Sequence, residues 1–132
     1  MLQYMQQIPS LYITDSELGG RGVFSSSPIE KGSIIEIAPV LVIPGSERDL
    51  LDKTIIHDYY FIWGLQDQQA ALILGNGSIY NHSFKPNAEY RPDFEGQTMS
   101  FFALMEIEAG QEITVNYNGT PDGKGRFWFH ES

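Results

Sequence analysis

Short apolar runs separated by turns make up most of this chain, and the pattern predicts a mostly β fold. The runs predicted to form strands are residues 11–13, 23–24, 33–43, 70–74, 88–90, 98–104 and 111–118. Glycine-bearing turns lie between them, for example at residues 93–96 and at Gly110. Strands this short and this closely spaced exclude a Rossmann-type fold, which needs strands and helices in alternation.

One short helix is predicted to begin near Ser46, a typical N-cap residue with Asp49 three positions later. The apolar positions that follow at helical spacing are Leu51, Ile55, Tyr59 and Ile62. The helix runs into an aromatic cluster at residues 58–64, and aromatic residues at the end of a helix usually pack in the core. Because Tyr59 and Tyr60 are adjacent, both cannot face inward, and we expect at least one hydroxyl to reach a cavity or solvent.

Two features of the apolar runs predict how the strands are arranged. Pro39 lies in the middle of residues 33–43, and because proline has no N–H it predicts either an edge strand or a break. Residues 29–35 and 107–113 share the frame Ile-Glu-x-Gly-x-x-Ile, which suggests a turn-and-strand unit used twice. The unit is too short for a solenoid repeat, so it indicates a pseudo-repeated β framework.

Composition narrows the class of protein. A chain of 132 residues predicts one domain, and its 42% hydrophobic content is enough to form a core. The absence of cysteine excludes disulfides, thiolate zinc sites and a cysteine nucleophile. No stretch resembles a signal peptide or a membrane span, so we expect a cytoplasmic or nuclear protein without membrane contact.

The net charge indicates the kind of partner. A formal charge of -9 at pH 7 disfavours direct binding of DNA or RNA, because acidic groups repel phosphate. The same charge would attract a basic peptide. The alternative is that the acidity only keeps a small domain soluble.

Polar and conformationally special residues gather in two places. Residues 76–88 are rich in Asn and Ser, include Gly77 and His82, and lie between two apolar runs, which is where a functional site is often mounted. The three glycines within residues 19–22 would let the backbone approach a ligand, although three glycines in a hairpin also form an ordinary turn. Taken alone, His82 fits a structural histidine better than a functional one, and Tyr117 fits the core or rim of a strand.

Three strings follow one another in order: Gly-Arg-Gly-Val-Phe at residues 20–24, Asn-His-Ser at 81–83 with Pro-Asn at 86–87, and Glu-Ile-Thr-Val-Asn-Tyr at 112–117. Their order and spacing resemble the Gly-x-Gly, Asn-His-Ser and Glu-Leu-Thr-x-x-Tyr motifs of the SET-domain lysine methyltransferases. The resemblance covers roughly residues 11–130. It is strongest to the compact viral and bacterial members, which lack pre-SET and Cys-rich post-SET modules, and the absence of cysteine agrees with that.

The resemblance implies a single SET domain over residues 1–132, with its core at about 11–118 and residues 119–132 as a linker and aromatic lid. The implied fold is of the β-clip type, with small curved sheets, one short helix and a C-terminal pseudoknot that involves the Asn-His-Ser segment. Some compact relatives are dimers, so the apolar run at residues 40–43 is expected to form either a homodimer interface or a core strand.

The implied reaction is transfer of a methyl group from S-adenosylmethionine to the side-chain amine of lysine in a basic protein such as a histone. A free lysine amine has a pKa near 10.4, so only roughly one in 2500 is neutral at pH 7. The site must lower that pKa by desolvation or by a nearby positive charge. Tyrosines and backbone carbonyls can line such a site without adding negative charge, and the reaction requires no metal.

Roles for individual residues follow from their motif positions in the family. Tyr117 matches the catalytic tyrosine. The expected lysine channel contains Tyr59, Tyr80 and Val115. The expected cofactor-binding residues are Gly20, Arg21, Gly22, Asn81, His82 and Trp128.

The chain departs from the family pattern in two places. Ser78 and Ile79 stand where many members have Arg-Phe, so the cofactor contacts there are expected to differ. Val115 stands where many members have Phe or Tyr, and the smaller side chain should leave more room near the amine. The missing Arg-Phe and the short tail motivate an alternative hypothesis, a non-catalytic SET-fold module that binds a basic peptide.

Overall fold

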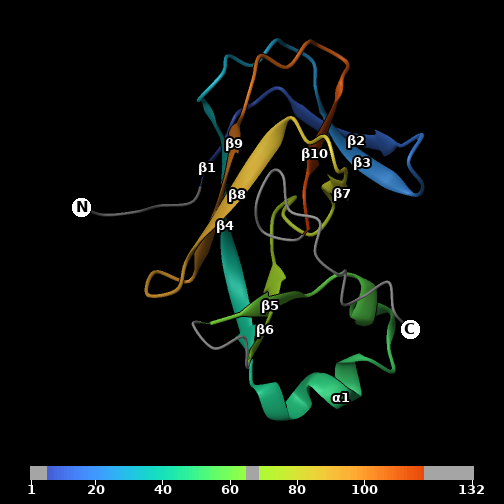
Figure 1. Cartoon of the computed structure of the whole chain (residues 1–132), viewed down its shortest axis with the longest axis vertical. Helices are drawn as coiled ribbons and strands as arrows, with labels where there is room; N and C mark the ends of the chain where they lie inside the picture. The colour runs from blue at the N-terminus through green and yellow to red at the C-terminus, as the bar shows by residue number, and fades with distance from the viewer. Residues whose placement is uncertain (1–5, 65–68, 118–132) are drawn as a thin grey trace.

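The computed structural model describes residues 6–64 and 69–117, and over these residues the chain is mostly β, with two curved sheets and one short α-helix. This confirms the predicted fold class. In Figure 1, strands β5 and β6 and helix α1 lie at the lower end of the long axis, and the hairpin of β2 and β3 lies at the upper end.

The larger sheet is wholly antiparallel and has the order β5-β6-β4-β9-β8, with β1 also paired to β4. Its strands are β1 (Gln6–Gln7), β4 (Ile34–Ile43), β5 (Phe61–Trp63), β6 (Gln69–Ile73), β8 (Ala88–Asp93) and β9 (Thr98–Ala103). Pro39 is the last residue of β4 to pair with β9, and Val40 is the first to pair with β6. The proline therefore marks a change of partner within a continuous central strand, so neither the predicted edge strand nor the predicted break is found.

The smaller sheet has the order β2-β3-β10-β7. Its strands are β2 (Leu11–Asp15), β3 (Arg21–Ser25), β7 (Asn81–His82) and β10 (Glu112–Val115). β10 pairs in parallel with β7, with Thr114 opposite Asn81 and Val115 opposite His82. This pairing lays the Asn-His-Ser segment beside the strand that leads to Tyr117, and it is the part of the expected pseudoknot that lies within the described residues.

The two repeated units contact each other. Ile29 and Ile107 form a bridge and exchange backbone hydrogen bonds of 2.8 and 2.9 Å. Gly32 and Gly110 both adopt left-handed φ values, 85° and 82°, and each N–H donates to the last carbonyl of the strand that precedes the other unit, Ala103 and Ser25 respectively. The strand that begins in each unit pairs with the strand that precedes the other unit: β4 pairs with β9, and β10 pairs with β3. The predicted pseudo-repeat is thus an approximate two-fold arrangement at the junction of the two sheets.

The core draws on both sheets. Its buried aliphatic and aromatic side chains include Val23, Ile35, Ile73, Tyr80, Met99, Phe101, Ile107, Ile113 and Val115. Burial of one such side chain contributes about 1.5–3 kcal/mol. This core holds the ends of β3, β7 and β10 together at the place where the polar motifs lie.

The helix is shorter than predicted. α1 covers only Arg48–Leu51, between 3₁₀ turns at Gly45–Glu47 and Ile55–Asp58. Ser46 lies inside the first turn and does not cap α1, so the predicted cap is wrong. The predicted apolar face is also wrong: Ile55 is 75% exposed and Ile62 belongs to β5. The physical reason is Thr54, whose hydroxyl donates to the carbonyl of Leu51 and accepts from the next turn, which starts a new turn instead of extending the helix.

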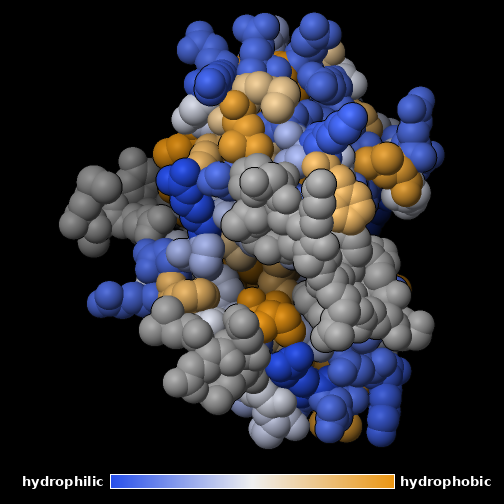
Figure 2. All heavy atoms as spheres, viewed as in Figure 1, coloured by the Kyte–Doolittle hydropathy of each residue, from blue (hydrophilic) through white to orange (hydrophobic). Residues whose placement is uncertain are grey.

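The surface carries both polar and apolar regions. On the face drawn in Figure 2, hydrophilic side chains gather toward both ends of the long axis, and apolar side chains reach the surface near the middle. In the run at residues 40–43, Val40 is buried whereas Leu41 is 53% exposed, so this segment is a core strand with one open face. Homodimerisation through that face stays a prediction. None of the helices in the described ranges has the length and apolar character needed to cross a membrane.

Candidate active site

A cavity of about 430 Å³ lies where four distant parts of the chain meet. These parts are the β2–β3 turn, the turn before β5, the loop from β6 to β7, and the residues after β10. The lining residues are Leu18, Gly19, Gly20, Arg21, Asp58, Tyr59, Ser78, Ile79, Asn81, His82 and Tyr117. Six of the residues predicted from sequence line it: Gly20, Arg21, Tyr59, Asn81, His82 and Tyr117. Trp128, like the lid expected at residues 119–132, lies outside the described residues.

The glycines of the β2–β3 turn have different uses. Gly19 and Gly20 adopt left-handed φ values of 117° and 58°, and no heavy atom lies within 4 Å of the place where a Cβ would be. Their backbone is therefore open to a ligand in the cavity. Gly22 does not line the cavity, and a Cβ there would collide with the carboxylate of Glu112. Gly22 is required by packing beneath the site.

Glu112 connects three of the walls. Its carboxylate accepts hydrogen bonds from the Ser16 hydroxyl at 2.6 Å and from the Asn81 amide at 2.8 Å. The same amide group donates to the carbonyl of Arg21 at 2.9 Å. Glu112 begins the string that ends at Tyr117, but no role for it was predicted from the sequence. It fixes the Asn81 side chain between the β2–β3 turn and β10.

Tyr117 is held at both its backbone and its hydroxyl. Its hydroxyl donates to the carbonyl of Tyr80 at 2.5 Å, and its N–H donates to Nδ1 of His82 at 3.1 Å. The ring meets Phe61 edge-on with centroids 6.1 Å apart, and the hydroxyl of Tyr90 donates to the Tyr117 carbonyl. Burial raises the pKa of the Tyr117 hydroxyl well above its ordinary value, so the group stays protonated at neutral pH.

Tyr80 contributes its main chain to the site. Its side chain is 1% exposed and stacks on Phe101 with centroids 4.4 Å apart. Burial first, and then the neighbouring Glu36 carboxylate, raise the pKa of its hydroxyl, which donates to Glu36 at 2.7 Å. The ring thus lies outside the cavity, in contrast to the expectation that it lines a lysine channel. The Val115 side chain is likewise fully buried and does not line the cavity.

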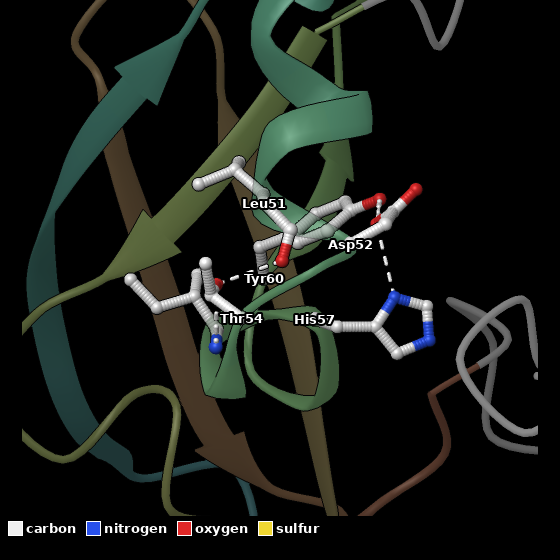
Figure 3. A network of polar contacts seen from close by, with 6 residues as sticks. Leu51, Asp52, Thr54, His57 and Tyr60 are labelled. Atoms are coloured by element: carbon white, nitrogen blue, oxygen red, sulfur yellow. Dashed lines mark hydrogen bonds and ion pairs between the residues drawn. The ribbon is translucent and has the colours of Figure 1, made fainter.

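Another wall of the cavity comes from the turn before β5, which contributes Asp58 and Tyr59. Tyr59 lines the cavity and is 40% exposed, whereas Tyr60 is buried, so the expectation that one of the two hydroxyls is accessible is confirmed. Figure 3 shows that Tyr60 and His57 point to the same carboxylate, that of Asp52. The Tyr60 hydroxyl lies 2.7 Å and His57 Nδ1 lies 2.9 Å from Asp52 Oδ1. This network holds the turn that carries Asp58 and Tyr59.

The chain is similar in sequence to known proteins. A family model described as the SET domain matches residues 20–118. A Schizosaccharomyces pombe protein named "Histone-lysine N-methyltransferase, H3 lysine-37 specific" is 32% identical over 122 residues, which are 92% of this chain and 78% of that protein.

Solved structures agree. The crystal structure of a Plasmodium falciparum protein, named as a candidate histone methyltransferase, has a TM-score of 0.65 and 34% identity, over 83% of this chain and 98% of that one. A humanized mutant of the Chaetomium thermophilum Polycomb Repressive Complex 2, bound to the inhibitor GSK126, has a TM-score of 0.70 over 84% of this chain and 15% of that one. Its identity of 20% bears on the fold alone.

Proposed function

The chain belongs to the SET-domain family of protein-lysine methyltransferases, and from this premise we propose that its cavity binds S-adenosylmethionine and that Tyr117 orients the amine of a lysine in a histone. Lysine methyl transfer is the general activity of the family.

The cavity fits the cofactor in size and in kind. Its volume of about 430 Å³ lies within the range of small-molecule sites, roughly 300–1,000 Å³. The open backbone at Gly19 and Gly20 allows close approach of a polar ligand, and Asn81 and His82 line the same cavity. When bound, the cofactor supplies the methyl group and a positive sulfonium charge. We assign Gly20, Arg21, Asn81 and His82 to its binding.

The pair formed by the Tyr117 hydroxyl and the Tyr80 carbonyl is the observation that carries the proposal. Both groups are neutral, since burial keeps the Tyr117 hydroxyl protonated. They offer oxygen lone pairs that accept N–H bonds from an amine, and they add no negative charge that would keep the amine protonated. Phe61 and Tyr90 pack against Tyr117 and exclude water from this side. The chain's contribution is therefore to desolvate and orient a neutral amine.

A basic segment of histone H3 is the substrate that we propose. The net charge of -9 favours a basic partner. The Schizosaccharomyces pombe relative is named for lysine 37 of histone H3. We therefore propose the H3 segment around that lysine as the first peptide to test.

The test is transfer of label from S-adenosylmethionine to this H3 peptide and to whole histones. We expect Tyr117→Phe to lower kcat roughly a hundredfold, because misplacement of the amine is costly, while the cofactor Kd changes less than about twofold. Tyr12→Phe is the matched control, because Tyr12 is an exposed tyrosine outside the cavity, and it should behave like the wild type. A peptide with arginine in place of the lysine should accept no label. Equal labelling by Tyr117→Phe and the wild type would contradict the role of Tyr117.

A further inference from the structure

Glu36 is a buried carboxylate outside the cavity. It is 1% exposed, yet it lies in β4 within an otherwise apolar run. Its Oε1 accepts from the Tyr80 hydroxyl at 2.7 Å, and its Oε2 accepts from the Gln7 amide at 2.8 Å and from the Asn76 N–H at 2.9 Å. Its hydrogen-bond partners in residues 6–64 and 69–117 are all neutral donors. Because water cannot replace a lost donor in the core, the loss of any one of these hydrogen bonds would cost free energy.

Most of these contacts hold one loop, residues 74–80, which joins β6 to β7. Gly75 has a φ of 60°, and a Cβ there would collide with the Glu36 carboxylate. Asn76 donates its backbone N–H to Oε2 of Glu36, and at the far end of the loop the Tyr80 hydroxyl donates to Oε1. Glu36 thus fixes both ends of the loop to β4.

The loop and the strand after it supply much of the cavity wall. Ser78 and Ile79 line the cavity, followed directly by Asn81 and His82 in β7. Tyr80 lies between these pairs, with its hydroxyl on Glu36 and its carbonyl accepting from the Tyr117 hydroxyl. One residue therefore connects the buried carboxylate to the group that we propose to orient the amine.

We propose that Glu36 is a positioning residue for methyl transfer: by holding the Tyr80 side chain, it fixes the Tyr80 carbonyl against the Tyr117 hydroxyl. This inference rests on the proposed function of Tyr117. Glu36 does not line the cavity, so it acts through the residues that it holds, and Tyr80 is the one of these whose carbonyl contacts the Tyr117 hydroxyl. A charged acceptor suits the role, because hydrogen bonds to an ionised group are short and strong.

Tyr80→Phe and Glu36→Gln test the proposal. Tyr80→Phe keeps the ring that stacks on Phe101 and removes the hydroxyl, and it should lower kcat about tenfold per folded molecule while KM for the peptide changes less than about twofold. In a Tyr117→Phe background the same change should lower kcat less than about twofold further, because residues that act as a unit are not additive. Ile107→Val is the control for loss of stability, since Ile107 is buried in the bridge to Ile29, away from this loop. If Glu36→Gln does not fold, Tyr80→Phe carries the test alone.

A second readout does not depend on activity. In protein with ¹³C-labelled tyrosine, the Tyr117 ring signal should move in Tyr80→Phe and stay in place in Ile107→Val. Wild-type kcat in Tyr80→Phe, or a full additional loss in the Tyr117→Phe background, overturns the positioning role and leaves the proposed function standing. If the wild type transfers no methyl group, the proposed function fails, and an unmoved Tyr117 signal in Tyr80→Phe then overturns the positioning role separately.

Discussion

Two walls of the cavity are built on the same device, a carboxylate that accepts a tyrosine hydroxyl at 2.7 Å. Behind the Asn-His wall, Glu36 holds Tyr80. Behind the wall formed by the turn before β5, Asp52 holds Tyr60. In each case the tyrosine is the chain neighbour of a residue that lines the cavity, Ile79 or Asn81 in one wall and Tyr59 in the other.

The two devices differ in their access to water. The Glu36 residue is 1% exposed, whereas the Asp52 side chain is 39% exposed. A buried carboxylate that loses a donor stays unsatisfied, which costs about 1–3 kcal/mol, whereas an exposed one takes a water molecule instead. The buried Glu36–Tyr80 pair therefore fixes its wall in one position, whereas the exposed Asp52–Tyr60 pair restrains its wall only weakly. We expect the turn that carries Tyr59 to be the wall that adapts to different substrates.

The largest effect on stability is expected at Gly75, whose backbone lies against the Glu36 carboxylate. Gly75→Ala should cost about 2–4 kcal/mol in the free energy of unfolding, because a left-handed residue gains a Cβ and that Cβ displaces Glu36. Gly32→Ala is the matched control, since Gly32 also has a left-handed φ but open space at the Cβ position. Urea unfolding of both variants measures the difference. Equal costs would mean that the Glu36 carboxylate moves aside freely, and the contrast between the walls would be lost.

A direct comparison of the two hydroxyls comes next in size. Tyr80→Phe should lower the free energy of unfolding by about 1–3 kcal/mol, because Oε1 of Glu36 is left without its donor in the core. Tyr60→Phe should cost less than about 1 kcal/mol, because solvent reaches Asp52. Chemical denaturation of the two variants under one set of conditions decides the matter. A larger cost for Tyr60→Phe would reverse the assignment of the fixed and adaptable walls.

The smallest effect concerns pH. The His57 hydrogen bond first, and then that of Tyr60, lower the pKa of Asp52 below its ordinary value of 3.8. The folded protein thus binds this proton less readily than the unfolded chain, so the contribution to stability is complete above about pH 4 and is lost as the pH falls through the lower folded value. Because Asp52 is exposed, the contribution should stay below about 1 kcal/mol.

The measurement is the difference in unfolding free energy between the wild type and Asp52→Asn, followed from pH 5 to pH 2. The difference should shrink toward the acid end, and it should be smaller throughout in a His57→Asn background, where the principal donor is missing. A difference that does not change with pH would show that the charge of Asp52 makes no contribution to the network.

The pattern of residues predicted the strands well, and it failed where local geometry departs from a simple period. In a regular strand successive side chains point to opposite faces, so Glu36 is expected on the face opposite the buried Ile35. A register shift between Ile34 and Glu36 removes that alternation, and both Ile35 and Glu36 are buried. No periodicity contains this information, so the carboxylate behind the site could not be found from sequence. The helix was overextended for a similar reason, because Thr54 starts a new turn.

The site was predictable to the extent that family motifs name its residues. Asn81, His82 and Tyr117 are far apart in sequence and come together through the parallel pairing of β7 and β10, which spacing alone does not predict. The motif gave Tyr80 a place in the site but could not tell which part of the residue faces the cavity. The Tyr80 ring is buried in the core, and the Tyr80 carbonyl is the part that contacts the Tyr117 hydroxyl.

The position of β10 between β3 and β7 determines when the site can form during synthesis on the ribosome. Translation delivers the β2–β3 hairpin and the Asn-His segment well before residues 112–117. Until those residues emerge, β3 and β7 have no strand between them, and a nascent chain has neither a closed cavity nor the tyrosine hydroxyl. Pairings between segments so distant in sequence also form slowly. Because Tyr117 is proposed to orient the amine, methyl transfer is expected to begin only after Tyr117 has left the ribosome and β10 has inserted, and partly made chains should not modify lysines.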